Sequence, residues 1–186
     1  MAHDTHHHHK ESFFTKYIFS QDHKMIGKQY LLTAIFMGAI GITLSALFRM
    51  KLGWPDTQFS ILESILGSDA APDGMLDSNW YLGLVTLHGT IMVFFVLTGG
   101  LSGTFSNLLI PLQVGARDMA SGLMNMIAYW LFFLSSVLMA ASLFIETGPA
   151  MAGWTVYPPL SVLEEFQPGS GLGMTLWLLS MTVFFL

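Results

Sequence analysis

The sequence contains no cysteine, and only 10% of its residues are charged. Without cysteine, the chain cannot form a disulfide, a thiolate copper site or the covalent attachment of a c-type haem. Soluble domains usually carry about a quarter charged residues, so this scarcity of charge excludes an ordinary soluble domain. The seven basic residues form no patch, which excludes nucleic acid as a partner.

The residues that are present are mostly apolar: hydrophobic types make up 53% of the chain, and the mean hydropathy is +0.58. A membrane-spanning helix needs about 20 apolar residues. We therefore predict an all-α integral membrane protein with four spanning helices, one for each uncharged run. These runs are 29–48, 78–116, 119–145 and 166–186. The second exceeds one crossing, so part of it is expected in a loop or at the interface, with Pro111 ending the helix.

We expect residues 1–28 to form a cytoplasmic tail and residues 29–186 to form one membrane domain. The tail is polar and rich in histidine, unlike a cleavable secretory signal, and its histidine run receives no functional role. Four lysines precede the first run, and Arg117 follows the second. This bias places the N-terminus in the cytoplasm and the long acidic loop 50–79 outside the cell.

His88 is the only histidine after residue 23, and it lies within the uncharged run 78–116. A titratable ring is expensive to bury in lipid unless something binds it, and imidazole is a common axial ligand of haem iron. Gly89 removes side-chain bulk where a flat macrocycle could approach the helix. An isolated histidine of this kind could equally be hydrogen-bonded to a neighbouring helix, so the ring alone leaves both interpretations open.

Three polar residues, Asn107, Asp118 and Asn125, lie near the short turn between the second and third runs. Asn125 follows Asp118 by seven residues, which is two helical turns. The three side chains could form a polar route from the cytoplasm towards the interior, since ionisable groups at such positions often mark proton pathways. The alternative is ordinary capping and interhelical bonding, with Asp118 paired to the adjacent Arg117.

Small and flexible apolar residues in the same runs have a simpler interpretation. The glycines at positions 99, 100 and 103 include a G-x-x-x-G spacing, which predicts close packing between helices. Thirteen methionines could suggest copper, but in membrane helices methionine is far more often a packing residue. Neither group indicates chemistry.

Six motifs lie in order along nearly the whole chain: Asp22–Gly27, Phe48–Gly53, Leu87–Phe95, Asn107–Leu112, Gly115–Ala120 and Gly153–Leu160. Together they resemble subunit I of the haem-copper oxidases, of the cytochrome c oxidase type. The resemblance implies a bundle of about twelve helices in a bacterial inner membrane, of which this chain would hold the first four. It also implies a proton-pumping terminal oxidase that reduces O2 to water with electrons from cytochrome c or a related donor.

The resemblance further implies roles for individual residues near the outer face. His88 matches an axial ligand of the low-spin haem, haem a in the aa3 type. Arg49 matches the arginine that hydrogen-bonds the formyl group of that haem, an assignment that assumes a buried guanidinium in need of an acceptor. Trp154 and Tyr157 match residues of an external loop near the haem propionates.

On the cytoplasmic side, Asp118 matches the acid at the mouth of the D proton channel, and Asn107 and Asn125 match asparagines just inside it. The family usually reads G-A-P-D-M-A-F-P-R-M-N-N here. This chain departs from that pattern at Arg117, Ser121, Gly122, Leu123 and Met126. Arg117 is expected to favour the ionised form of Asp118. Lys51 replaces an acid that binds a cation in many members, so no such cation site is predicted.

The remaining ligands implied by the family, those of the high-spin haem and of copper B, lie beyond this chain. No catalytic residue is therefore expected within it, and alone it should be inactive. The implied partners are oxidase subunits II and III, the electron donor and membrane lipid. Two alternatives remain: an accessory membrane subunit without a redox centre, and a b-type haem carrier that takes a second histidine from elsewhere.

Overall fold

A computed structural model describes residues 12–145, 148–163 and 171–186, and all regular structure within these ranges is helical. The long elements are α1 (His23–Gly53), the continuous series α3 (Ser78–Thr90), η3 (Ile91–Leu101) and α4 (Ser102–Val114), and α5 (Gly122–Ala141). The shorter ones are η1 (Phe14–Ile18), α2 (Ser60–Leu66), η2 (Pro72–Gly74), η4 (Ser142–Phe144) and α6 (Leu172–Phe184).

Side chains that cap the first backbone N–H groups fix where the long helices begin. Asp22 accepts from the amides of Lys24 and Met25 at the start of α1. Asp77 caps α3 in the same way, and Ser121 caps α5. The polar residues between the apolar runs therefore define the helix boundaries.

Within the described residues, three helical segments are long and apolar enough to cross a membrane: His23–Gly53, Ser78–Val114 and Gly122–Phe144. They confirm an all-helical protein suited to a membrane. The fourth predicted crossing corresponds to α6, which is apolar but has only 13 residues.

The second run is helical from Ser78 to Val114, so the part that was expected in a loop or at the interface is not a loop. Its 37 residues would extend about 55 Å at 1.5 Å per residue, well beyond the roughly 30 Å of hydrocarbon. The expectation that Pro111 ends this helix is also wrong, because Pro111 lies inside α4 and is buried. The helix ends at Gly115, whose left-handed conformation allows its amide and that of Ala116 to bond back to the last turn.

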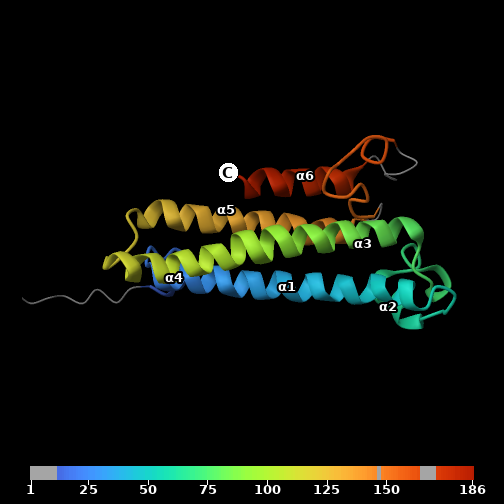
Figure 1. Ribbon diagram of the computed structural model, residues 1–186, viewed down its shortest axis with the longest axis horizontal. Coiled ribbons are helices and arrows are strands. Elements are labelled where there is room, and N and C mark those ends of the chain that lie inside the picture. The colour runs from blue at the N-terminus through green and yellow to red at the C-terminus, as the bar shows by residue number, and fades with distance from the viewer. Residues whose placement is uncertain (1–11, 146–147, 164–170) are drawn as a thin grey trace, which may run out of the picture.

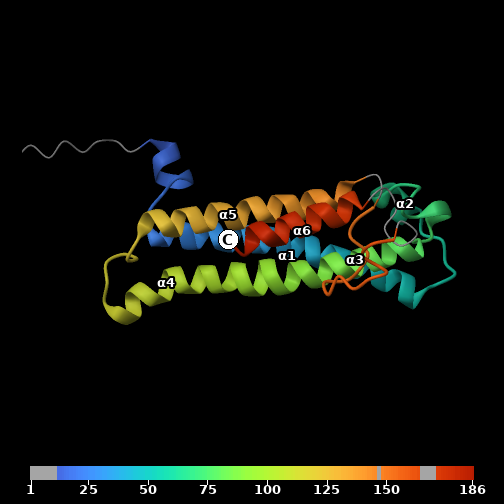
Figure 2. The ribbon, with the colours of Figure 1, turned by 90° about the horizontal axis from the view of Figure 1, so that it is seen from above.

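The long helices run side by side, with α6 packed on α5 (Figures 1 and 2). One end of the bundle carries η1, the end of α4 and the start of α5, and the opposite end carries α2 (Figure 1). The core contains large apolar side chains of α1, α3, η3, α5 and α6, including Met37, Leu87, Phe95, Met139 and Trp177.

Glycines bring α1 close to the η3–α4 region, as the small-residue spacing predicted. A methyl group added to Gly100 would collide with Ala34 of α1. One added to Gly103 would lie 2.6 Å from a ring carbon of Tyr30. The close approach between these helices therefore depends on the absence of these two side chains.

Candidate functional site

His88 lies near the end of α3, half-buried, and its ring is held by a neighbouring helix. Its Nδ1 is 2.8 Å from the backbone carbonyl oxygen of Gly41 in α1. A carbonyl can only accept, so Nδ1 carries the proton, and Nε2 of the neutral ring keeps a lone pair. The ring of Phe48 packs edge-on against the imidazole, with 5.5 Å between the centroids.

The surroundings of His88 leave room for a flat group beside the helix. Gly89 is exposed, and no heavy atom lies within 4 Å of the position that a Cβ would occupy there. Of the two ring nitrogens of His88, only Nδ1 makes a hydrogen bond to a described residue. A ring with a fixed Nδ1 proton, a bare Nε2 and an open glycine beside it fits the donor set that haem iron takes from histidine.

Arg49 follows Phe48, whose ring packs against His88, but the Arg49 side chain itself is exposed. The premise of a buried guanidinium is therefore wrong for this chain. The cause is position: Arg49 is in the last turns of α1, on a face that no described element covers.

The loop after α5 reaches the same side of the bundle. Gly153 donates its amide proton to the hydroxyl of Thr86 in α3, at 3.1 Å. The next residue, Trp154, packs against Phe94 of η3 with 5.7 Å between ring centroids, although 57% of Trp154 stays exposed. Tyr157 is 70% exposed. The structure thus brings Trp154 to the helix that carries His88, but leaves Tyr157 on the surface.

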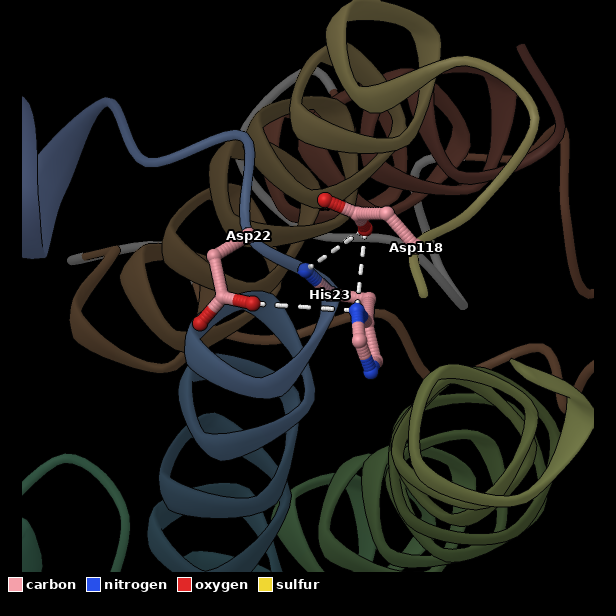
Figure 3. A group of neighbouring side chains, drawn as sticks. All are labelled: Asp22, His23 and Asp118. Atoms are coloured by element: carbon pink, nitrogen blue, oxygen red, sulfur yellow. Dashed lines mark hydrogen bonds and ion pairs between the residues drawn. The ribbon is translucent and has the colours of Figure 1, made fainter. Parts of the chain in front are cut away.

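At the opposite end, Asp118 binds the first turn of α1 (Figure 3). Its Oδ1 is 2.9 Å from Nδ1 of His23 and also accepts the His23 backbone N–H at 3.4 Å. Asp22, the cap of α1, places a carboxylate oxygen 3.6 Å from the same ring nitrogen. The His23 ring is only 4% exposed, whereas the Asp118 side chain is about half exposed.

The pKa of Asp118 reflects two opposing effects. Desolvation by burial raises the pKa, but hydrogen bonds from the Met119 amide and from the His23 ring and amide together lower it below its ordinary value. The predicted influence of Arg117 is not the cause, because every ion pair found in the described part of the chain involves His23. The alternative pairing of Asp118 with Arg117 is therefore not observed.

Asn107 and Asn125 do meet, as the sequence suggested. The Asn125 side-chain amide of α5 donates to Oδ1 of Asn107 in α4, and the Asn107 amide donates to the carbonyl of Gly103 at 2.8 Å. Asn107 is almost fully buried. The two asparagines bridge α4 and α5, on either side of the turn that carries Asp118.

Sequence reasoning missed His23, although this residue belongs to the motif Asp22–Gly27. The signal that could have found it is the dipeptide itself: a helix-capping aspartate followed by a histidine that must lie in the first turn. The ligand atoms of Asp22, His23 and Asp118 all lie within 4.8 Å of one another. The hydrogen bonds already described account for this grouping without a metal ion.

Comparison with known proteins yields one family. The model described as Cytochrome C and Quinol oxidase polypeptide I matches residues 25–186. An "Alternative cytochrome c oxidase subunit 1" from Bradyrhizobium diazoefficiens is 43% identical over 95% of this chain and 27% of its own length. A "Probable quinol oxidase subunit 1" from Staphylococcus haemolyticus is 38% identical over 86% of this chain and 21% of its own length.

A "Heme-copper oxidase subunit I+III" from Aeropyrum pernix is 36% identical over 90% of this chain and 19% of its own length. The chain therefore spans about a fifth to a quarter of the length of the curated relatives described here.

Proposed function

Because the chain belongs to the family of cytochrome c and quinol oxidase polypeptide I, we propose that it forms the amino-terminal part of the catalytic subunit of a terminal respiratory oxidase. That subunit reduces O2 to water with electrons from a respiratory donor and pumps protons. Cytochrome c is the preferred donor in this proposal, since the relative that is 43% identical carries the name of a cytochrome c oxidase subunit.

The observation that carries the proposal is the geometry of His88. The Gly41 carbonyl holds the proton on Nδ1, which would leave the Nε2 lone pair of His88 to hold the iron of a low-spin haem, haem a in the aa3 type. This haem, when bound, supplies reversible one-electron transfer. Gly89 leaves space for the macrocycle on one side, and the Phe48 edge restricts rotation of the imidazole.

Other residues of the outer end position the same group. Arg49 offers a guanidinium to a polar haem substituent, and its exposure in this chain leaves it available for that contact. Trp154 and Tyr157 would hold the haem propionates on the outer side. The ligands of the high-spin haem and of copper B belong to parts of the subunit outside this chain.

At the other end, Asp118 collects protons from the cytoplasm. His23 fixes the orientation of the carboxylate, and its backbone amide adds a second hydrogen bond to the same oxygen. Protons then pass inward past Asn107 and Asn125 through ordered water, and the hydrogen bond between the two amides fixes their orientation. Amide side chains suit such a route because each can donate and accept hydrogen bonds.

The assembly proposed is a multi-pass complex in a bacterial inner membrane, with subunits II and III and membrane lipid as partners. A relative named as a fused subunit I+III supports an intimate association with subunit III. The alternative of an accessory subunit without a redox centre is not favoured, because the matched family is polypeptide I itself.

The test is replacement of His88 by Ala in the complete oxidase, because loss of an axial ligand should remove the low-spin haem absorbance. The matched control is His23→Ala, which removes a histidine at the other end of the bundle and should leave that absorbance intact. An unchanged low-spin spectrum in a folded His88→Ala complex would contradict the proposed ligand.

A further inference from the structure

The segment Ser12–Phe19, which contains η1, lies beside the bundle instead of beyond its end (Figure 2). Gln29 holds it there by donating from its side-chain amide to the carbonyls of Tyr17 and Ile18, at 2.8 and 3.1 Å. Gln29 is the seventh residue of α1, about 9 Å along the helix. The segment therefore lies at a depth that the first turns of a membrane-spanning helix occupy.

Four aromatic side chains of this segment are largely exposed. Phe13, Phe14, Tyr17 and Phe19 are 65%, 63%, 41% and 54% exposed. The Phe13 ring contacts both Phe14 and Tyr17, with centroid separations of 6.1 and 5.1 Å. Phe19 also packs on Trp130 of α5, which fixes the aromatic group against the side of the bundle. Tyrosine is enriched at the membrane–water interface, and phenylalanine is typical of the apolar face of interfacial helices.

Residues 12–28 carry net positive charge, because three lysines stand against the single carboxylate of Asp22. Lys16, Lys24 and Lys28 are all exposed, and none of them forms an ion pair within the ranges that the structure covers. Lys16 and Lys28 line one hollow of about 600 Å³. The same hollow also contains the carboxylates of Asp22 and Asp118, which accept hydrogen bonds from backbone amides and from His23.

We propose that residues 12–28 form an interfacial anchor that binds anionic phospholipid of the leaflet around the N-terminal end of the bundle. The aromatic side chains lie at the boundary between headgroups and acyl chains, and the lysines bind the headgroup phosphates. Charge complementarity and the lateral position of the segment both select the surrounding bilayer as the partner. The proposal goes beyond the oxidase function and requires only that the bundle spans a membrane.

The experiment measures amide hydrogen exchange of residues 12–21 in the complete oxidase. The oxidase is placed in nanodiscs of phosphatidylcholine, with or without phosphatidylglycerol. Exchange should be slower with phosphatidylglycerol. The double variant Lys16→Gln/Lys28→Gln should lose this difference, with preference for the anionic lipid falling about fivefold for each lysine removed. The charge-conserving variant Lys16→Arg/Lys28→Arg should keep it.

Two controls make the result specific to a lipid at this segment. Lys51→Gln removes a lysine at the opposite end and should leave the exchange difference unchanged. Soluble phosphate added to phosphatidylcholine nanodiscs should not slow exchange; if it does, the site binds free anions and the proposal is wrong. Equal exchange of wild-type residues 12–21 in both lipids overturns it as well, and an intact haem spectrum in each variant establishes that the bundle has folded.

Discussion

Asp118 contacts a histidine 95 positions earlier in the chain, and this contact determines the chemistry that its carboxylate can perform. Because its pKa lies below the ordinary value despite the cost of burial, the side chain is ionised at neutral pH. The stabilisation from the hydrogen-bonded carboxylate is therefore present above the ordinary carboxyl pKa and is lost as pH falls through the lowered value. An ionised, fixed carboxylate attracts protons electrostatically, and its lowered pKa means that it releases a bound proton readily.

We predict that Asp118→Asn in the complete oxidase slows turnover on the order of a hundredfold, as expected when a positioned proton-transfer group is lost. Proton pumping should fall with it, while both haem spectra stay normal, because Asp118 follows the far end of α4 whereas His88 lies in α3. Oxygen consumption and pH changes in proteoliposomes provide the measurement. Arg117→Gln is the control, and the channel role is refuted if both variants turn over like the wild type.

Arg49 gives a second prediction at this scale. Its guanidinium is exposed next to Phe48, whose ring contacts His88. Arg49→Met should shift the low-spin haem band and lower the reduction potential, since a positive charge near the haem favours the reduced form. The measurement is a redox titration followed optically, and Lys51→Met is the matched charge-removing control. Identical bands and potentials in both variants would show that Arg49 does not contact the haem.

Some residues of the candidate site could be predicted from the sequence, and others could not. His88 was identifiable because a single histidine in a long apolar run needs a partner. Its partner, the Gly41 carbonyl, was not, since backbone acceptors carry no signature in the sequence. The contact between His23 and Asp118 and the exposure of Arg49 both depend on how distant segments pack, which local patterns do not determine.

At the scale of elements, glycine decides how closely α1 and the η3–α4 region approach. We predict that Gly103→Ala destabilises the bundle by about 1–3 kcal/mol, because the new methyl group would overlap the Tyr30 ring. Gly53→Ala is the matched control, since no heavy atom lies within 4 Å of its added methyl group. Thermal unfolding in detergent measures both, and equal unfolding temperatures would disprove the close-packing account.

The helices themselves were largely predictable, because long uncharged runs have few alternatives in a membrane. The residues at which the helices end were harder to predict. Pro111 was expected to end its helix, but one missing amide is tolerated within α4, and the left-handed Gly115 provides the end instead. The acidic loop 50–79 also contains α2 and η2, short helices that the composition of the loop did not predict.

For the molecule as a whole, the two ends of the bundle carry different charges. The end with η1 bears most of the basic residues, and the end with α2 bears many of the acidic ones. We predict that a protease site inserted after Trp54 is cleaved in intact spheroplasts, whereas one inserted after Ala116 is cleaved only after lysis. Gel analysis of the fragments tests this, and the reverse pattern would invert the proposed orientation.

The hydrogen bond between His88 and Gly41 also couples the distance between α1 and α3 to the electronic properties of the imidazole. The donor ring belongs to α3 and the acceptor carbonyl to α1, so a change in helix separation changes the length of the bond. If His88 binds iron as proposed, a shorter bond makes the imidazole a stronger electron donor and stabilises the oxidised metal. Lateral compression of the bilayer, or a thicker membrane that tilts the helices, would then be measurable as a shift in midpoint potential.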